Sequence, residues 1–216
     1  MYYDNNINGT LVLCEVMKKY GCKKIVFSSS ATVYGDPAST PIREDFPLSA
    51  TNPYGRTKLF IEEMLRDIYV SDNSYKIVLL RYFNPVGAHE SGKIGELPIG
   101  VPQNLVPFIT QTGIGLREQL SVFGDDYPTP DGTCIRDYIH VVDLAKAHVV
   151  ALERLLQNKN KENCETFNLG TGTGSSVLEV IKSFEKVSGE KLNYKIVDRR
   201  EGDIISAYAD TNKAND

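Results

Sequence analysis

The chain has 216 residues, 41% of them hydrophobic and 24% charged, which is an ordinary composition for one large or two small globular domains. Its 24 cationic and 28 anionic side chains give a net charge of -4, so we expect no nucleic-acid partner, since proteins that bind nucleic acids carry a basic face. No apolar run approaches the ~20 residues that span a bilayer, so we also expect no membrane association.

The predicted elements alternate between helices and strands along the first third of the chain. Residues 5–19 carry apolar side chains at helical spacing, and Gly21 is well placed to end that helix. A short apolar strand covers 23–27, a polar loop covers 36–51, a helix covers 53–70 and a second strand covers 76–82. This order is typical of an α/β fold with a doubly wound parallel sheet.

Two residues on the predicted 53–70 helix stand out, Tyr54 and Lys58. A helix places positions i and i+4 on one face, and Pro53 suits the first helical position, so the phenol and the ammonium lie side by side. By itself this spacing is ordinary surface geometry, with a packed tyrosine and a solvated lysine. The 23–27 strand, however, delivers the hydroxyl cluster 28–32 at its carboxyl end, where open α/β sheets bind ligands. The combination predicts a redox catalytic site.

The chemistry of such a pair depends on the pKa of the phenol. A free phenol has a pKa of about 10, so a base working near pH 7 needs it lowered by roughly three units, or about 4 kcal/mol. One cation about 5 Å away, at an effective dielectric constant near ~20, supplies about 3 kcal/mol. We therefore predict that Lys58 lowers the pKa of Tyr54, and that the positive ring of an oxidised nicotinamide supplies the remainder.

These residues sit in longer motifs. The chain resembles the extended short-chain dehydrogenase/reductase family, and within it the UDP-glucose 4-epimerases, over nearly all of its length. The motifs that carry the resemblance are Tyr2-Tyr3-Asp4-Asn5-Asn6, Phe27-Ser28-Ser29-Ser30-Ala31-Thr32-Val33-Tyr34-Gly35, Asn52-Pro53-Tyr54-Gly55, Arg81-Tyr82-Phe83-Asn84-Pro85-Val86-Gly87-Ala88-His89 and Arg136-Asp137-Tyr138-Ile139-His140-Val141.

The resemblance implies a role for each catalytic residue. Tyr54 would take the proton of the sugar 4-hydroxyl, and Lys58 would bind the nicotinamide ribose. Ser30 would bridge the substrate hydroxyl and the phenol, with Thr32 as a supporting hydroxyl. The cofactor would be NAD, and the residues implied to contact it are Asn5, Ser28, Ser29, Tyr54, Lys58 and Phe83. Asn5 could equally be a helix cap.

The substrate implied is a UDP-hexose, oxidised at C4 to a 4-keto sugar and then reduced from the other face. Such an enzyme grips its substrate mainly through UDP. The residues implied to contact the substrate are Ser30, Tyr54, Asn84, Asn104, Leu105, Val122, Phe123 and Arg136. Arg136 suits a diphosphate because its guanidinium is a planar bidentate donor. Arg199-Arg200 is either a substrate clamp or a solvated basic pair.

Two other functions stay open. Nucleotide-sugar dehydratases and related enzymes resemble the chain around Tyr54, but carry an acidic residue after the strand serine or threonine. The segment Ala31-Thr32-Val33-Tyr34 has none, which favours simple epimerisation. The alternatives are therefore a dehydratase or reductase acting on another nucleotide sugar, and an inactive remnant that binds nucleotide sugars.

The resemblance also predicts the organisation of the chain. Residues 1–83 and 138–170 would belong to an NAD-binding Rossmann domain, and 84–137 with 171–216 to a smaller mixed α/β substrate domain. The glycine-rich turn that opens such a cofactor domain is not found, and the family's last substrate-binding segment is missing at the other end. We therefore expect an internal fragment that binds NAD poorly or not at all and is inactive by itself. The glycine run 170–174 has its third glycine one position too early for that turn, and we interpret it as a strand-to-helix turn capped by Ser175 or Ser176.

The remaining expectations concern assembly, metals and location. A homodimer formed through the 5–19 and 53–70 helices is plausible by family resemblance. We expect no metal, because neither the cysteines nor the histidines have partners at metal-ligand spacing. No secretory segment precedes the cysteines, so reduced thiols in a cytoplasmic protein are expected. The cysteines are Cys14, Cys22, Cys134 and Cys164, and the histidines His89, His140 and His148.

Overall fold

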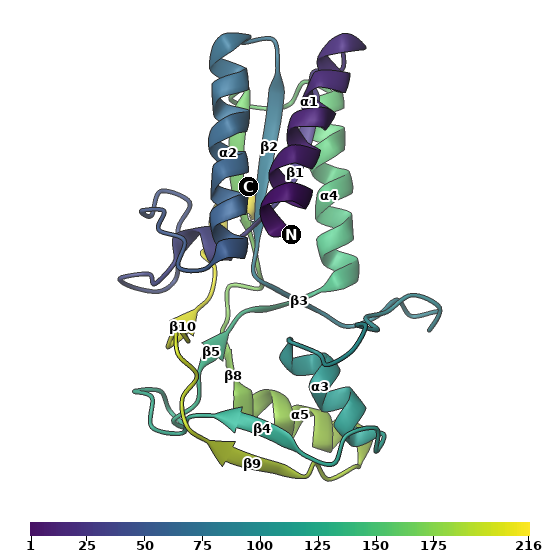
Figure 1. The fold of residues 1–216 in the computed structure, drawn as a ribbon, viewed down its shortest axis with the longest axis vertical. Helices are drawn as coiled ribbons and strands as arrows, with labels where there is room; N and C mark the ends of the chain where they lie inside the picture. The colour runs from purple at the N-terminus through teal and green to yellow at the C-terminus, as the bar shows by residue number, and fades with distance from the viewer.

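A three-stranded parallel sheet forms the centre of the upper part of the molecule in Figure 1, in a computed structural model that describes residues 1–216. The strands lie in the order β1 (Lys24–Ser30), β2 (Lys76–Tyr82) and β7 (Cys164–Leu169). Five consecutive residues of β2 are buried, as expected for a central parallel strand covered on both faces. Both predicted strands are therefore present.

Helix α2 (Pro53–Ser71) covers one face of the sheet and carries the two residues singled out above. Pro53 occupies the first turn, and the Asn52 side chain accepts a hydrogen bond from the Gly55 amide at 2.8 Å, which fixes where the helix begins. Ile61 and Leu65 of the helix pack on the sheet. The predicted 53–70 helix is confirmed.

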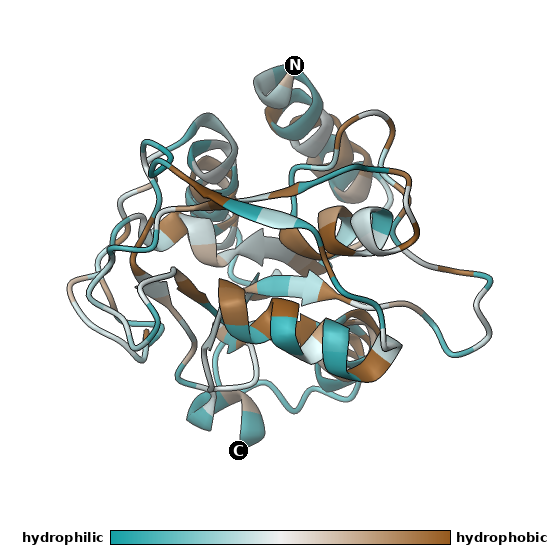
Figure 2. Cartoon of the chain, turned by 90° about the horizontal axis from the view of Figure 1, so that it is seen from below, coloured by the Kyte–Doolittle hydropathy of each residue, from teal (hydrophilic) through white to brown (hydrophobic).

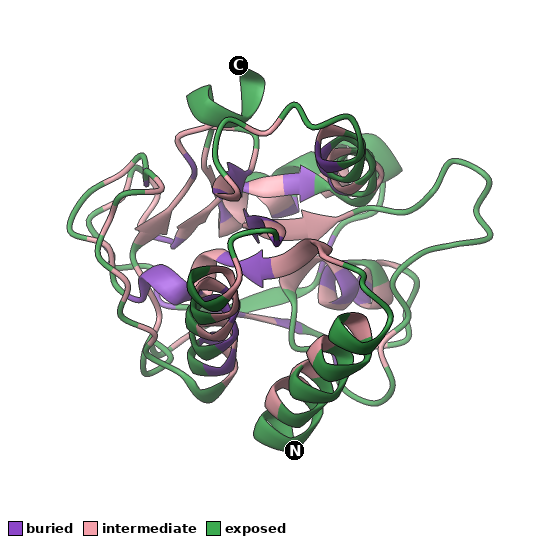
Figure 3. Cartoon of the chain, turned by 90° about the horizontal axis from the view of Figure 1, so that it is seen from above, coloured by how far each residue is buried: buried purple, intermediate pink, exposed green.

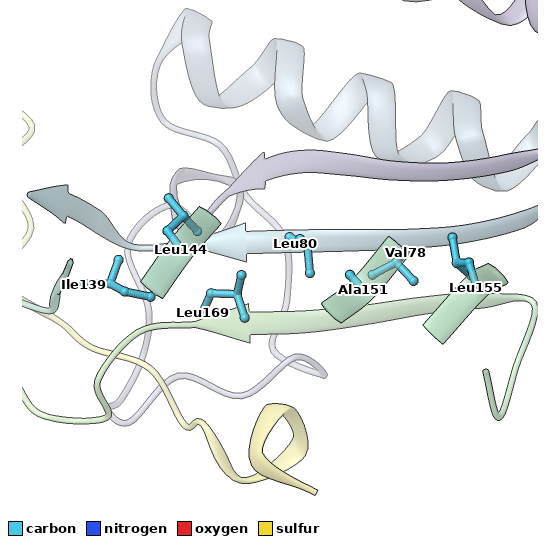
Figure 4. Packing of buried hydrophobic residues seen from close by; sticks show 7 residues of the cluster. All are labelled: Val78, Leu80, Ile139, Leu144, Ala151, Leu155 and Leu169. Atoms are coloured by element: carbon cyan, nitrogen blue, oxygen red, sulfur yellow. The ribbon is translucent and has the colours of Figure 1, made fainter. Parts of the chain in front are cut away.

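Helix α4 (Val141–Leu156) covers the opposite face of the sheet. Its residues Leu144, Ala151 and Leu155 share one helical face and pack against Val78 and Leu80 of β2 (Figure 4). Burying each large aliphatic side chain contributes about 1.5–3 kcal/mol, so this contact fixes the helix firmly to the sheet. The His140 ring caps the helix by accepting a hydrogen bond from the Val142 amide at 3.2 Å.

Helix α1 (Gly9–Lys19) lies on the same side of the sheet as α2 and is more exposed than α2 and α4 (Figure 3). A π-helical turn, Tyr3–Asn8, leads into it, so the helix begins earlier than the predicted 5–19 range. Gly21 adopts φ +67° just beyond the helix, as predicted for its end. None of the residues of α1 is buried.

The lower part of the molecule is a mixed α/β unit built on a separate apolar core (Figure 1). Apolar and polar residues alternate along helix α5 (Val177–Ser188) (Figure 2). Its apolar Ile181 packs against Ile109 of helix α3 (Leu105–Gly113) and Val122 of strand β4 (Leu120–Phe123). The elements of this part are α3 (Leu105–Gly113), β4 (Leu120–Phe123), β5 (Ile135–Arg136), β8 (Ser175–Ser176), α5 (Val177–Ser188), β9 (Tyr194–Val197) and β10 (Ser206–Ala207).

The chain passes between the two parts beside one buried carboxylate, Asp137. Strands β3 (Asn84–Val86) and β6 (Tyr138–His140) pair where the sheet part ends. After β10 the chain returns to the sheet: Ala209 pairs with Ile42, and α6 (Asn212–Asn215) lies against β7. Residues 208–215, predicted to belong to the substrate domain, therefore lie on the sheet part.

Among the helices of this structure, none combines the length and the apolar character that a membrane span needs.

Candidate active site

The strand-end hydroxyls lie where β1 and β2 end, at the junction of the two parts (Figure 1). A single turn, Ala31–Tyr34, follows Ser30, and the Ser30 hydroxyl accepts hydrogen bonds from the Thr32 amide at 3.2 Å and the Thr32 hydroxyl at 2.9 Å. Gly55 of α2 lies against this turn, and a Cβ there would come within 2.8 Å of the Thr32 carbonyl oxygen. The glycine after Tyr54 thus allows α2 to approach the hydroxyls closely.

Lys58 lies between Tyr54 and the end of β1. Its Nζ lies 5.6 Å from the centre of the Tyr54 ring and donates a hydrogen bond to the Ser28 carbonyl oxygen at 2.8 Å. Burial lowers the pKa of Lys58. The predicted pairing of phenol and ammonium on one helix face is present, and the ammonium keeps two further donors for a ligand.

The pKa of Tyr54 moves in the direction opposite to the prediction. Burial raises it first, the neighbouring Tyr82 adds to the rise, and the Ser30 hydroxyl opposes it, leaving the pKa at about 12. The prediction of a lowered net pKa is therefore wrong for the chain's own side chains, because removal of the phenol from water outweighs a cation whose nearest partner is the Ser28 carbonyl.

Three residues around this cluster were not predicted. Tyr82 ends β2 directly opposite Ser30 in the parallel register, a position that the strand pattern alone could have indicated. His148 of α4 lies 2.7 Å from the Ser28 hydroxyl through Nε2, and its Nδ1 lies 2.8 Å from the Leu144 carbonyl oxygen. Tyr2 packs edge-on against Tyr54, with ring centres 5.7 Å apart. No local sequence signal pairs His148 or Tyr2 with the site.

The predicted cofactor residues separate into accessible and buried groups. Ser28 sits between Lys58 and His148, whereas the Ser29 side chain is fully buried on the other face of the strand and donates to Glu62 at 2.5 Å. The Ser29 side chain is thus unavailable to a ligand, and any contact to a cofactor would come from its main chain. The reason is strand geometry, since successive side chains point to opposite faces.

Asn5 and Phe83 lie on either side of this cluster. Asn5 is exposed in the first turn of the molecule and donates to Asn6 at 3.0 Å, without capping a helix. Phe83 is buried against Val33 and Tyr34 directly after β2. Their predicted contacts to the cofactor stay predictions.

A cavity of about 560 Å³ lies in the lower part of the molecule. Asn84, two residues beyond Tyr82, is the first residue along the chain that lines it. Its lining combines apolar side chains with a few polar ones, as is usual for small-molecule sites. Each residue predicted for the nucleotide lines it: Asn84, Asn104, Leu105, Val122, Phe123 and Arg136. The structure therefore brings the predicted nucleotide residues together at one cavity.

Two arginines give this cavity its positive charge. Arg136 is half-buried, with one guanidinium nitrogen donating to the Ile135 carbonyl at 2.8 Å. Arg200 lies over the Phe123 ring, 5.3 Å from its centre, and pairs with Asp203 at 2.7 Å. Arg200 and Asp203 both line the cavity, and neither was in the predicted set of substrate residues. Arg199, the sequence neighbour of Arg200, pairs instead with the exposed Asp126 outside the cavity, so of this basic pair only Arg200 lines the cavity.

The glycine run after β7 encloses a carboxylate of the chain itself. Asp137 accepts hydrogen bonds from the amides of Thr171 and Gly172, and a Cβ on Gly170 would lie 2.2 Å from its Oδ2. Ser176 caps α5 with a capping box, as interpreted from the sequence. With its amides engaged by Asp137, this turn does not cradle a pyrophosphate.

Comparison with known proteins gives a consistent result. The sequence profile of the NAD dependent epimerase/dehydratase family matches residues 1–170. The UDP-glucose 4-epimerase of Bacillus subtilis is 62% identical over 99% of this chain, which spans 62% of that relative's length. Over 99% of its length the chain also matches the crystal structure of the Bifidobacterium longum UDP-glucose 4-epimerase in complex with NAD+ and UDP, with 57% identity and a TM-score of 0.91, and covers 63% of it.

A second solved structure agrees. It is a UDP-glucose-4-epimerase from Stenotrophomonas maltophila with bound NAD and formylated UDP-arabinopyranose, 50% identical with a TM-score of 0.94, and the chain covers 62% of it. The predicted Rossmann-type α/β fold is therefore confirmed.

Proposed function

The chain belongs to the NAD dependent epimerase/dehydratase family, and on this premise we propose that the protein interconverts UDP-glucose and UDP-galactose by inverting C4. The observation that carries the proposal is that Tyr54, Lys58 and Ser30 lie together where the strands end, and that the strand opposite Ser30 leads within two residues to a cavity lined by two arginines. Relatives named UDP-glucose 4-epimerase, 57–62% identical over nearly the whole chain, support it.

In this proposal Tyr54 is the proton acceptor. Its phenolate takes the proton of the sugar 4-hydroxyl while C4 becomes a ketone, and it returns the proton after the hexose has turned over. With the pKa at about 12, the phenolate at pH 7 requires a further stabilisation of about 7 kcal/mol. Ser30 and Thr32 supply a short hydroxyl chain that can orient the substrate hydroxyl toward the phenol.

NAD is the cofactor proposed, and the residues at the end of β1 fit its nicotinamide ribose. Lys58 has one hydrogen bond and two donors to spare, which suits a pair of ribose hydroxyls. When bound, NAD supplies a hydride acceptor that gives the hydride back to C4, together with a positive ring that favours the phenolate. Ser28, held by Lys58 and His148, lies at the same edge.

The cavity is the proposed UDP site. Arg136 and Arg200 provide the charge to match a diphosphate, and Phe123 with Leu105 provides apolar surface for a base. Strong contacts to UDP, and few to the sugar, leave the hexose free to present either face to the hydride acceptor. The turn after Ser30 contains no carboxyl group that could shuttle a proton in an elimination.

We place the protein in the cytoplasm and propose a homodimer through α1. All four cysteines are free thiols, consistent with a reducing compartment. On α1, Leu11, Val12, Leu13 and Val16 are 47–59% exposed, and we call them the α1 patch. Several exposed apolar side chains on one helix are typical of an interaction surface.

The test is conversion of UDP-galactose to UDP-glucose in the presence of NAD, assayed on the 216-residue chain and on the longest natural form of the protein that contains it. Tyr54→Phe should remove most turnover while leaving UDP binding within about twofold, since the phenyl ring keeps its packing but cannot accept a proton. Wild-type turnover in that variant, release of free NADH, or loss of water from the substrate would each overturn the proposal.

A further inference from the structure

Glu62 of α2 and Arg81 of β2 form a buried ion pair that the proposed mechanism does not use. Glu62 is 0% exposed and Arg81 is 2% exposed. The guanidinium donates to both carboxylate oxygens, from Nε at 2.9 Å and from Nη2 at 2.6 Å. Arg66 donates to the same carboxylate at 3.1 Å from the edge of the molecule.

Stability alone does not account for this pair. Removing two charges from water is unfavourable, and well-packed apolar residues of similar volume often stabilise a protein equally or better. Apolar neighbours are at hand, because Ile61 and Leu65 of α2 already pack on Ile77 and Leu79 of β2. What the ion pair adds is direction: a fork of two short hydrogen bonds fixes two elements relative to each other more narrowly than apolar packing does.

The elements it joins are the ones that carry the catalytic groups. Glu62 lies on α2 one turn beyond Lys58 and two turns beyond Tyr54. Its carboxylate also accepts from the hydroxyl of Ser29, which stands between Ser28 and Ser30 on β1. The network therefore connects the Tyr54 helix to the hydroxyl strand at the level of the active site.

Arg81 extends the network past the hydroxyl turn. Its Nη1 donates to the Tyr34 hydroxyl at 2.9 Å, and Tyr34 closes the turn that contains Thr32. The Tyr34 hydroxyl in turn donates to Asn168 of β7 at 2.6 Å. The segment from Ser29 to Tyr34 is thus bonded at both ends to one buried ion pair.

We infer that Glu62 and Arg81 are positioning residues, which hold the Tyr54–Lys58 helix in register with the Ser30–Thr32 hydroxyls; this inference rests on the proposed function. Neither side chain reaches the cavity or the phenol. Their effect is on the distance between the proton acceptor and the hydroxyl chain, and a misplacement of about 1 Å at a reacting centre can lower a rate by about 10²-fold.

The test is the double variant Glu62→Met with Arg81→Met in the active form of the protein. It should remain folded, with kcat lowered by about 30- to 100-fold and KM for the UDP-sugar within about threefold, because the cavity is untouched. The matched control is Glu165→Met with Arg154→Met, which removes another bidentate pair, at 2.8 and 2.9 Å, located between β7 and α4. The control should keep kcat within about twofold. Wild-type kcat in the folded double variant overturns the inference.

Two further measurements keep the inference testable if the double variant does not fold or the proposed function fails. In Glu62→Gln, which keeps volume and one acceptor, kcat should fall with KM unchanged, and wild-type kcat counts against the inference. A fluorine label at position 54, as 3-fluorotyrosine, should give a shifted or split resonance in Glu62→Gln but not in Glu165→Gln. A moved resonance with no epimerase activity in the wild type would reject the proposed function and keep the positioning role, whereas an unmoved resonance rejects the positioning role.

Discussion

Replacing Asp137 with asparagine is expected to destabilise the protein severely although the side chain barely changes shape. The carboxylate is fully buried and accepts four hydrogen bonds. Its Oδ1 accepts from the amide and hydroxyl of Thr171, both at 2.7 Å, and its Oδ2 accepts from the amides of Gly172 and Ala209, both at 3.1 Å. An asparagine amide offers only one acceptor atom, so its N–H group faces either the amides of Gly172 and Ala209 or the Thr171 side, where the hydroxyl can accept but the amide cannot.

The magnitude follows from those contacts. At least one buried amide is left without an acceptor, which costs about 1–3 kcal/mol, and the remaining bonds lose their charge assistance. We expect a loss of about 3–5 kcal/mol in the free energy of unfolding. This is a large part of the roughly 5–15 kcal/mol that is typical of a whole domain.

Urea denaturation, followed by far-ultraviolet circular dichroism, measures this loss. Asp143→Asn is the control, because Asp143 is exposed and its contact with Lys146 spans 3.6 Å; its loss should stay below about 1 kcal/mol. If both variants lose the same small amount with unchanged m-values, the carboxylate does not hold the three segments together and the reasoning fails.

Three further predictions follow from single contacts. Lys58→Met should lower kcat by about 100-fold, because a cation near Tyr54 contributes about 3 kcal/mol to the phenolate; unaltered steady-state rates would contradict this. The pKa of Asp72 should be about 2, because Lys23 and Ser74 donate to it; its stabilising effect is then complete above pH 4 or so and is lost as the pH falls toward 2. An NMR titration should find that pKa closer to 3.8 in Lys23→Met, and no change would exclude Lys23 as a cause. Leu13→Glu with Val16→Glu should halve the mass in sedimentation equilibrium, and an unchanged mass would exclude the α1 patch as the dimer face.

The parts of the site that could be predicted are those with local signals. Tyr54 and Lys58 are four residues apart behind a helix-opening proline, and the hydroxyl cluster follows a short apolar strand, so spacing alone places both. The six nucleotide residues came from resemblance, and the structure gathers all of them at one cavity. Each of these depends on residues near one another in sequence or on family motifs.

The parts that could not be predicted depend on contacts between distant segments. Glu62 and Arg81 are 19 residues apart in the sequence, and Tyr34 and Asn168 are 134 residues apart. No local sequence pattern indicates that either pair is in contact. The pKa of Tyr54 was predicted in the wrong direction because burial is a property of the whole fold. Ser29 is a different case: the alternation of side chains along a strand would have placed it opposite Ser28 and Ser30.

The way the chain passes between its two parts has a consequence for how a substrate enters. Four connections run between them: β3 to α3, β5 to β6, β7 to β8 and β10 to α6. The last three converge on the Asp137 carboxylate through its own backbone and the amides of Thr171 and Ala209. A hinge motion that closed one part onto the other would have to bend these three connections together and break their hydrogen bonds to Asp137. We therefore propose that the UDP site is formed before the ligand binds, and that only the sugar ring of the ligand changes its orientation.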